Sequence, residues 1–206
     1  MATLATIRTT IADQLNRSDL SSQITDELNK AITHYSAARF WFNEAQTTFS
    51  LVAGQQAYGT ADSVPSTLTE IDFLKVTVSS TYYELKAKPF DWIEQENKTN
   101  LRGIPEYYAY YLSKIHLYPL PNSTYTATLS YSKSYADLSA DADTNDFTTY
   151  AIDLITQRAK KNILKNYVHD FEMAMQTEKQ EDEALNSLII KTNRLKETRQ
   201  IEPSQF

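Results

Sequence analysis

The spacing of apolar residues changes twice along this chain of 206 residues, and these two changes constrain the fold most strongly. Up to residue 42, and again from residue 147, apolar side chains recur every three or four residues, which is typical of helices that pack on one face. Between these segments apolar and polar residues alternate, as in strands with one buried face. The sequence therefore predicts helices at both ends and a β-domain between them.

Two pairs of helices are expected from the terminal segments. Residues 3–16 and 21–42 form the first pair, and residues 147–168 and 170–191 form the second. Residues 178–183, at the centre of the last helix, are polar on all sides, since they read Glu-Lys-Gln-Glu-Asp-Glu. A helix that is polar all round is not held by a core, so we expect this stretch to project into solvent or toward a partner.

The central segment contains the candidate strands. Residues 68–79 alternate between apolar and polar side chains, but the alternation slips between Phe73 and Val76, which predicts a β-bulge. Residues 107–118 predict a hairpin of two aromatic-rich strands. Residues 124–131 alternate apolar side chains with threonine and serine, which predicts a strand with one buried and one solvent-exposed face.

These patterns predict an α+β fold in which a bundle of four main helices carries an inserted, mainly antiparallel β-domain. The helical bundle would comprise residues 1–45 and 136–191, and the β-domain residues 46–135. Residues 192–206 contain few apolar side chains and a late proline, which indicates a flexible C-terminal arm.

Composition excludes several kinds of functional site. Cysteine is absent, which rules out disulfides, thiolate metal sites and a cysteine nucleophile. The three glycines are too few and too far apart for a phosphate-binding loop. No apolar run approaches the roughly 20 residues that span a bilayer, so we expect no membrane contact. The net charge of −6 argues against broad binding to phosphate, although it permits passive contact with DNA.

The remaining candidates for chemistry are three histidines and one acidic loop. His34, His116 and His169 each lack a second ligand at metal spacing, which favours structural or surface roles. The acidic loop, residues 137–146, resembles the start of a calcium loop but lacks the required glycine and the final glutamate. We interpret it as a loop that caps the following helix, with weak cation binding left open. We therefore predict no catalytic, cofactor-binding or metal-binding residues, and no cofactor.

Five short motifs accompany this order of helices, strands and acidic loop. They are Leu15-Asn16-Arg17-Ser18-Asp19-Leu20, Phe40-Trp41-Phe42, Gly54-Gln55-Gln56-Ala57-Tyr58, Gly103-Ile104-Pro105-Glu106-Tyr107-Tyr108 and Ile115-His116-Leu117-Tyr118-Pro119-Leu120-Pro121-Asn122. In their order and spacing these motifs resemble the adaptor proteins of tailed bacteriophages, which are also called head-to-tail connectors or gatekeepers. The resemblance covers nearly the whole chain.

The resemblance implies a non-enzymatic structural protein of the virion. Adaptors of this kind form a ring, usually dodecameric, beneath the portal ring, where they extend the DNA channel and dock the tail. The expected partners are therefore the portal protein, tail or nozzle proteins, further copies of the same chain, and DNA in passive contact within the channel. The expected location is the neck between head and tail, after synthesis in the cytoplasm of the bacterial host.

The C-terminal segment is the predicted portal-docking arm, because it is basic within an acidic protein. Its basic residues would set the register against an acidic groove, and its apolar residues would act as anchors. The residues in question are Lys191, Arg194, Lys196, Arg199, Ile201 and Phe206.

Three other interpretations remain open at this point. The chain could be another neck or tail-completion protein, such as a stopper or terminator. It could also be a small hydrolase that uses Asp and His residues, or a cellular scaffolding protein unrelated to phages. Ring stoichiometry, a panel of hydrolase substrates and the identity of neighbouring genes discriminate among these classes.

Overall fold

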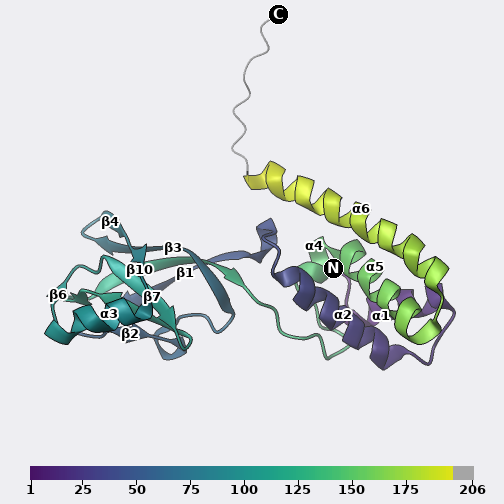
Figure 1. Ribbon diagram of the computed structural model, residues 1–206, viewed down its shortest axis with the longest axis horizontal. Helices are drawn as coiled ribbons and strands as arrows, with labels where there is room; N and C mark the ends of the chain where they lie inside the picture. Colours follow the sequence, from purple (N-terminus) through teal and green to yellow (C-terminus); the bar gives the residue numbers. More distant parts are fainter. Residues whose placement is uncertain (197–206) are drawn as a thin grey trace, which may run out of the picture. The chain divides into compact units, whose positions relative to one another are not determined.

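The computed structural model describes residues 1–196 and divides the chain into two units (Figure 1). The helical unit combines Met1–Asn43 with the chain from Tyr135 onward, and the β unit consists of Glu44–Ser134. Each unit has its own core of buried apolar side chains. The chain therefore leaves the helical unit once, completes the β unit and returns.

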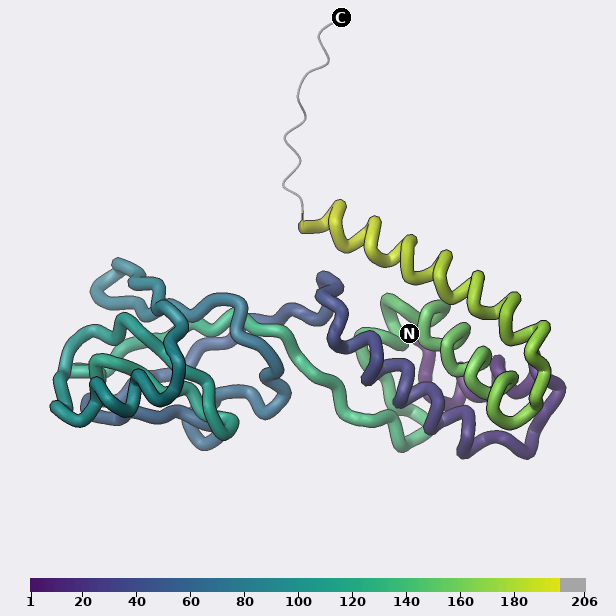
Figure 2. Tube along the Cα trace, viewed as in Figure 1, coloured from purple at the N-terminus to yellow at the C-terminus, as the bar shows by residue number. Residues whose placement is uncertain are grey.

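The helical unit is built from helices near both ends of the chain. In order, they are α1 (Leu4–Leu15), α2 (Ser21–Ser36), the short 3₁₀ helix η1 (Trp41–Asn43), α4 (Asp146–Tyr150), α5 (Ile152–Ile163), the π-helical segment η4 (Leu164–Val168) and α6 (Phe171–Lys196). The apolar stripe predicted for α1 is buried, since Leu4, Ile7 and Ile11 all face the core. Figure 2 shows α5 and α6 side by side, joined through η4.

The predicted fold class, a bundle of four main helices with an inserted β-domain, is wrong. Within residues 1–196 the fold is α+β with six α-helices and extensive antiparallel sheets, and the helices are split across the chain. The expected third helix is broken at Ala151, whose non-helical backbone (φ −134°, ψ 30°) separates α4 from α5. Five of these helices belong to the helical unit, and the remaining one, α3 (Phe90–Glu96), lies within the β unit. Apolar periodicity continues across such a break, so it did not show where one helix ends and the next begins.

The second helix also ends earlier than its apolar pattern suggested. It stops at Ser36 instead of residue 42, and the side-chain amide of Asn43 donates to the carbonyl oxygens of Ala38, at 2.6 Å, and Ser36, at 3.4 Å. Phe40 and Phe42 remain buried although they lie outside α2. Their burial in the core continues the apolar pattern without continuing the helix.

The β unit contains two four-stranded sheets and one two-stranded sheet. The first has the order β1 (Glu44–Leu51), β10 (Tyr125–Lys133), β3 (Leu68–Val78) and β4 (Thr81–Glu84), with all neighbours antiparallel. The second has the order β2 (Ala57–Tyr58), β8 (Lys114–Tyr118), β7 (Tyr107–Tyr111) and β5 (Lys86–Ala87). The two-stranded sheet pairs β6 (Arg102–Gly103) with β9 (Leu120–Pro121) in parallel.

Two local predictions for the β unit have clear outcomes. The hairpin is confirmed, since β7 and β8 pair antiparallel and their turn residues Leu112 and Ser113 both have positive φ. The irregularity lies earlier than predicted: the register with β10 shifts between Ile71 and Phe73 and again between Leu68 and Glu70, not between Phe73 and Val76. Leu74 and Val76 both face the core, which keeps the alternation regular over the segment where we expected it to slip.

We expect the Tyr58→Phe substitution to lower the free energy of unfolding by about 1–2 kcal/mol. The ring is fully buried, and the hydroxyl lies 3.0 Å from the Val52 amide nitrogen and 3.1 Å from the Gln55 carbonyl oxygen. Phenylalanine would fill the same space but leave the Val52 amide without this partner. Urea unfolding measures the loss, and Tyr82→Phe at an exposed position is the matched control. Equal losses in both variants would contradict the assigned role.

Candidate docking surface

The last helix, α6, carries half of the residues predicted for portal docking, and it is anchored along one side. Ala174, Thr177, Glu181, Leu188 and Thr192 are its buried residues, spaced three, four, seven and four apart. This spacing forms a single stripe, and α5 packs beside it. The stripe is made mainly of small and polar side chains, so it differs from an ordinary apolar face.

The centre of α6, residues 178–183, was expected to project into solvent or toward a partner, and all of these residues except Glu181 are exposed. Glu181, in the middle of the polar stretch, is only 3% exposed. Its Oε1 accepts hydrogen bonds from the hydroxyl of Tyr35 and, at 2.8 Å, from the guanidinium of Arg158. The ammonium of Lys161 lies 2.6 Å from Oε2 and forms an ion pair without a well-aligned hydrogen bond. Tertiary partners on α2 and α5 therefore make burial of this carboxylate possible.

The surroundings of Glu181 favour its ionised form. Burial by itself raises the pKa of this carboxyl group, because the charged form loses its hydration. The close contact with the Lys161 ammonium and the hydrogen bonds from Tyr35 and Arg158 act in the opposite direction and together outweigh burial, so the net pKa lies below its usual value. Burial and the hydrogen bond to Glu181 both raise the pKa of Tyr35, which therefore stays protonated as a donor.

Sequence reasoning missed Glu181, although a signal for it was present. Ala174, Glu181 and Leu188 are each separated by seven residues, so they lie on the same face of a helix. Following that face from the small residue Ala174 to the apolar Leu188 places the glutamate at its centre. A charged residue in the middle of a packing face indicates a partner of opposite charge elsewhere in the fold.

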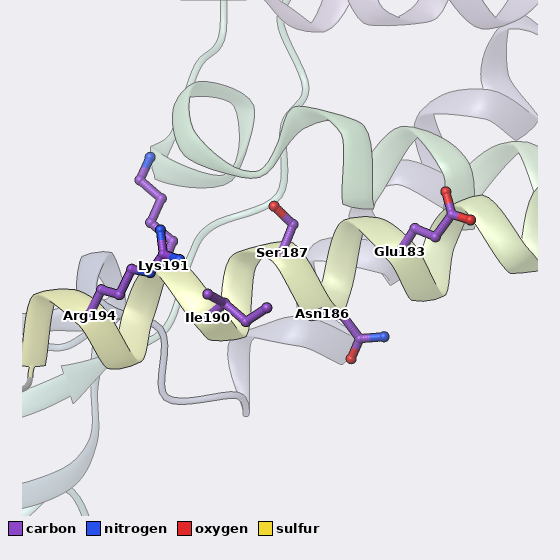
Figure 3. A pocket seen from close by; sticks show the side chains of 6 residues that line it. All are labelled: Glu183, Asn186, Ser187, Ile190, Lys191 and Arg194. Carbon is purple, nitrogen blue, oxygen red and sulfur yellow. The ribbon is translucent and has the colours of Figure 1, made fainter.

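A shallow groove follows the C-terminal half of α6 (Figure 3). Its lining is mixed, with one exposed aliphatic side chain, two cations, one anion and two neutral polar groups. The lining residues are Glu183, Asn186, Ser187, Ile190, Lys191 and Arg194. Ile190 is 51% exposed, so an apolar side chain lies in solvent beside the two basic residues. The groove suits a partner that offers both an apolar contact and an acidic group.

The structure assigns separate positions to the residues predicted for portal docking. Lys191 and Arg194 line the groove, and the ammonium of Lys191 also lies 4.7 Å from the ring centroid of Trp41, as a cation–π pair. The ammonium of Lys196 donates to the Arg39 carbonyl oxygen at 2.9 Å. Arg199, Ile201 and Phe206 lie outside the described residues.

The helix also extends beyond the boundary expected from the sequence. We expected a flexible arm from residue 192, but residues 192–196 continue α6. Thr192 is buried and its hydroxyl donates to the Leu188 carbonyl oxygen at 2.9 Å. Packing of this threonine against the core therefore stabilises an additional turn that its polar sequence did not predict.

The three histidines lie on separate elements. His34 is on α2, His116 is on β8, and His169 follows η4 with a left-handed φ of 60°. His116 Nδ1 is 4.0 Å from Glu94 Oε1, and burial lowers its pKa more than that carboxylate raises it. In residues 1–196, no three His, Asp or Glu side chains gather in an arrangement that could hold a metal ion.

Two carboxylates of the acidic loop have partners within the helical unit. Asp143 Oδ2 accepts hydrogen bonds from the amides of Ser139 and Ala140, both at 2.8 Å. Asp141 pairs with the guanidinium of Arg8 at 2.8 Å. At the end of the loop, the side chain of Asn145 accepts from an amide in the first turn of α4, so the loop caps this helix.

Comparisons with known proteins place the chain in one family. A search of curated proteins finds no match. The family model described as SU10 adaptor protein matches residues 2–203, which is nearly the whole chain. Across residues 1–196, no helix combines the length and the apolar character needed to cross a membrane. The chain therefore belongs to the SU10 adaptor protein family, an adaptor family of tailed phages.

Proposed function

We propose that this adaptor is a head-to-tail connector, whose copies form a ring beneath the portal, extend the DNA channel and dock the tail. The family match over residues 2–203 is the observation that carries the proposal. The proposed partners are the portal protein on one side and tail or nozzle proteins on the other. The proposed ring is dodecameric, and its location is the neck of the virion.

The physical properties of the chain support a structural role. A ring subunit needs two different lateral surfaces that bind head to tail and close, and it needs no reactive groups. The polar residues that are buried in the helical unit, such as Glu27 and Glu181, have structural partners: Glu27 accepts from Asn162 and Lys30 at 2.8 Å. The net charge of −6 supports a channel along which DNA passes without binding.

The connector proposal is tested by mixing the purified chain with the portal protein of the same phage. Native mass spectrometry would give the stoichiometry, and electron microscopy of the mixture would show where the chain binds. We expect a closed ring on the portal. If the chain does not bind the isolated portal but binds a preassembled portal–adaptor complex, it is instead a stopper or tail-completion protein.

We further propose that the end of α6 and the residues after it form the portal-docking arm. Arg194 and Ile190 line the groove, and Arg199, Ile201 and Phe206 follow them in the sequence, so this segment combines positive charge with apolar side chains. Charges of this kind set the register against an acidic partner more than they set affinity, whereas the apolar side chains supply anchoring area.

Deleting residues 197–206 is expected to weaken portal binding by about tenfold or more, while the thermal unfolding temperature stays unchanged. A deletion that starts at Thr192 would also remove a buried residue of α6 and could lower stability, so the deletion from residue 197 tests docking separately from folding. Light scattering of the chain mixed with portal gives the binding readout. Lys160→Ala, a basic change on α5, is the matched control. If the shortened chain binds portal as well as the full chain does, the arm has no docking role.

A further inference from the structure

The first sheet of the β unit has a long free edge. β1 pairs with β10 over eight residues in unbroken register, and among the described strands none pairs with its other side. Proteins usually protect such edges with prolines, lysines, bulges or inward-pointing charges. β1 contains no proline and no lysine, it has no bulge against β10, and its only charged residue, Glu44, is at the strand end. Its backbone is therefore open to pairing with another strand.

The opposite edge of the same sheet is also exposed. β4 pairs only with β3, and all four of its residues are exposed to solvent. Tyr82 is 64% exposed and Tyr83 is 43% exposed, so two large aromatic side chains lie at this edge without a covering element. Tyrosine is enriched at the cores of protein interfaces, where the ring supplies area and the hydroxyl supplies a hydrogen bond.

The strand order makes these two edges complementary. The four strands alternate in direction, so an even number of strands leaves β1 and β4 running in opposite directions. When identical copies are placed side by side in the same orientation, β4 of one copy meets β1 of the next in the antiparallel sense. A sheet with an odd number of strands would bring the two edges together in parallel.

Side-chain faces match across such a junction as well. The register aligns one residue from each strand in a row across the outer face of the sheet. In strand order, these residues are Thr48 on β1, Thr128 on β10, Lys75 on β3 and Glu84 on β4. Phe49 and Val76 occupy the inner face. Addition of the next β1 to β4 therefore keeps polar residues outside and apolar residues inside.

From these observations we propose that β1 of one copy pairs antiparallel with β4 of its neighbour, so that the first sheet continues from subunit to subunit. The occupant of each edge is thus a second copy of this chain. This inference rests on the proposed ring, and it assigns a pair of lateral surfaces to it. The junction is head to tail, as ring closure requires, because the two paired edges differ.

The length of β4 limits the strength of each junction. Four residues of strand extend over about 13 Å and form only a few hydrogen bonds between chains. A single junction of this size is weak, so free subunits remain mostly monomeric. A ring collects many such junctions, and a surface that holds neighbouring copies in place raises their effective concentration.

The absence of cysteine provides a direct test by disulfide trapping. Cross-strand neighbours have Cα atoms about 4.5–5.5 Å apart, within the range that a disulfide spans. The variants carry one cysteine on the outer face of β1, at Gln46, Thr48 or Ser50, and one on β4, at Tyr82 or Glu84. Scanning these positions covers the alternative registers. Each variant is oxidised both as concentrated free protein and after assembly on portal.

Controls come from the same sheet. Thr48→Cys combined with Thr128→Cys joins directly opposed residues of β1 and β10, so it should form a disulfide within one chain and report that oxidation works on a folded sheet. Thr128→Cys alone lies on a central strand and should not link copies. Mixing a single-cysteine β1 variant with a single-cysteine β4 variant should give dimers and nothing larger.

We expect at least one double variant to give a ladder of covalent oligomers that collapses to monomer on reduction. Self-dimers of the β1 single variants would overturn the proposal in favour of a two-fold β1–β1 contact. Rings that assemble on portal but show no cross-link at any scanned pair would overturn this inference and leave the connector function standing. If the unmodified chain forms no ring and no scanned pair cross-links in concentrated protein, both proposals fail.

Discussion

The Glu181→Ala variant is expected to lose about 3–5 kcal/mol of unfolding free energy at neutral pH. The change leaves Arg158 and Lys161, both largely buried, next to each other without the carboxylate that they share. It also removes the hydrogen-bond acceptor of the Tyr35 hydroxyl. Chemical denaturation followed by tryptophan fluorescence gives the difference. A loss below about 1 kcal/mol would mean that water replaces the carboxylate and that the buried network is not important for stability.

Two further variants isolate the charge from the packing. Glu178→Ala removes a carboxylate of the same helix that also pairs with Lys161, at 3.3 Å, but is 57% exposed. Its loss should stay within about 1 kcal/mol, as for surface ion pairs. Glu181→Gln keeps the size and a hydrogen-bond acceptor but removes the charge, so its loss should fall between those of the two alanine variants.

The contribution of Glu181 should depend on pH in a defined direction. Its pKa in the folded state lies below the ordinary value of 4.5, so the folded protein binds fewer protons here than the unfolded chain does. The stabilisation is therefore fully present above about pH 4.5, and it is lost as the pH falls through the folded-state pKa. Accordingly, the gap between the original chain and Glu181→Gln should narrow in acid. A gap that widens in acid would contradict the assignment.

The second large effect is expected for Phe147→Ala, at about 3–5 kcal/mol. Phe147 lies in α4, after the chain has returned to the helical unit, and is fully buried. Its ring lies edge-on to Phe42, at 5.1 Å between centroids, to Tyr135, also at 5.1 Å, and to Phe40, at 6.3 Å. Alanine would leave a cavity between η1 and α4. Both elements contact the core through the aromatic rings around Phe147.

Conservative and exposed substitutions define the controls for Phe147. Phe147→Leu fills most of the volume and should cost less than the alanine change, since large hydrophobic replacements are tolerated better than cavities. Phe171→Ala, at a ring that is 59% exposed on α6, should change stability by about 0.5 kcal/mol or less. Thermal and urea unfolding of the three variants ranks their losses of unfolding free energy. A loss for Phe147→Ala no greater than that for Phe171→Ala would contradict its role in the core.

Local patterns predicted many elements because the information lies within a few neighbouring residues. The spacing of Leu4, Ile7 and Ile11 is enough to orient α1, and all three are buried. The aromatic alternation around the β7–β8 turn likewise specifies a hairpin without reference to the rest of the chain. The same local reasoning identified the adaptor family from motifs whose order follows that of the elements, and the family model agrees.

Errors arose wherever a distant contact decided the outcome. Ser36 ends α2 although apolar residues follow it, because Phe40 and Phe42 reach the core from outside this helix, Phe42 from the separate 3₁₀ helix η1. Ala151 interrupts a segment whose apolar spacing is continuous on both sides. The bulge in β3 follows from where Leu74 and Val76 must lie against the opposite sheet, and the slip in alternation marked the wrong place.

The sequence by itself placed helices near both ends of the chain and strands between them, and it indicated the family, because side-chain periodicity and short motifs are local properties. Only the tertiary structure decided how α6 is held. Its polar centre looks solvent-exposed when taken alone, yet Glu181 is buried by Tyr35, which is 146 residues away, and by Arg158 and Lys161 on α5. A carboxylate enters a protein interior only when partners replace its hydration, and the fold alone brings these three donors together.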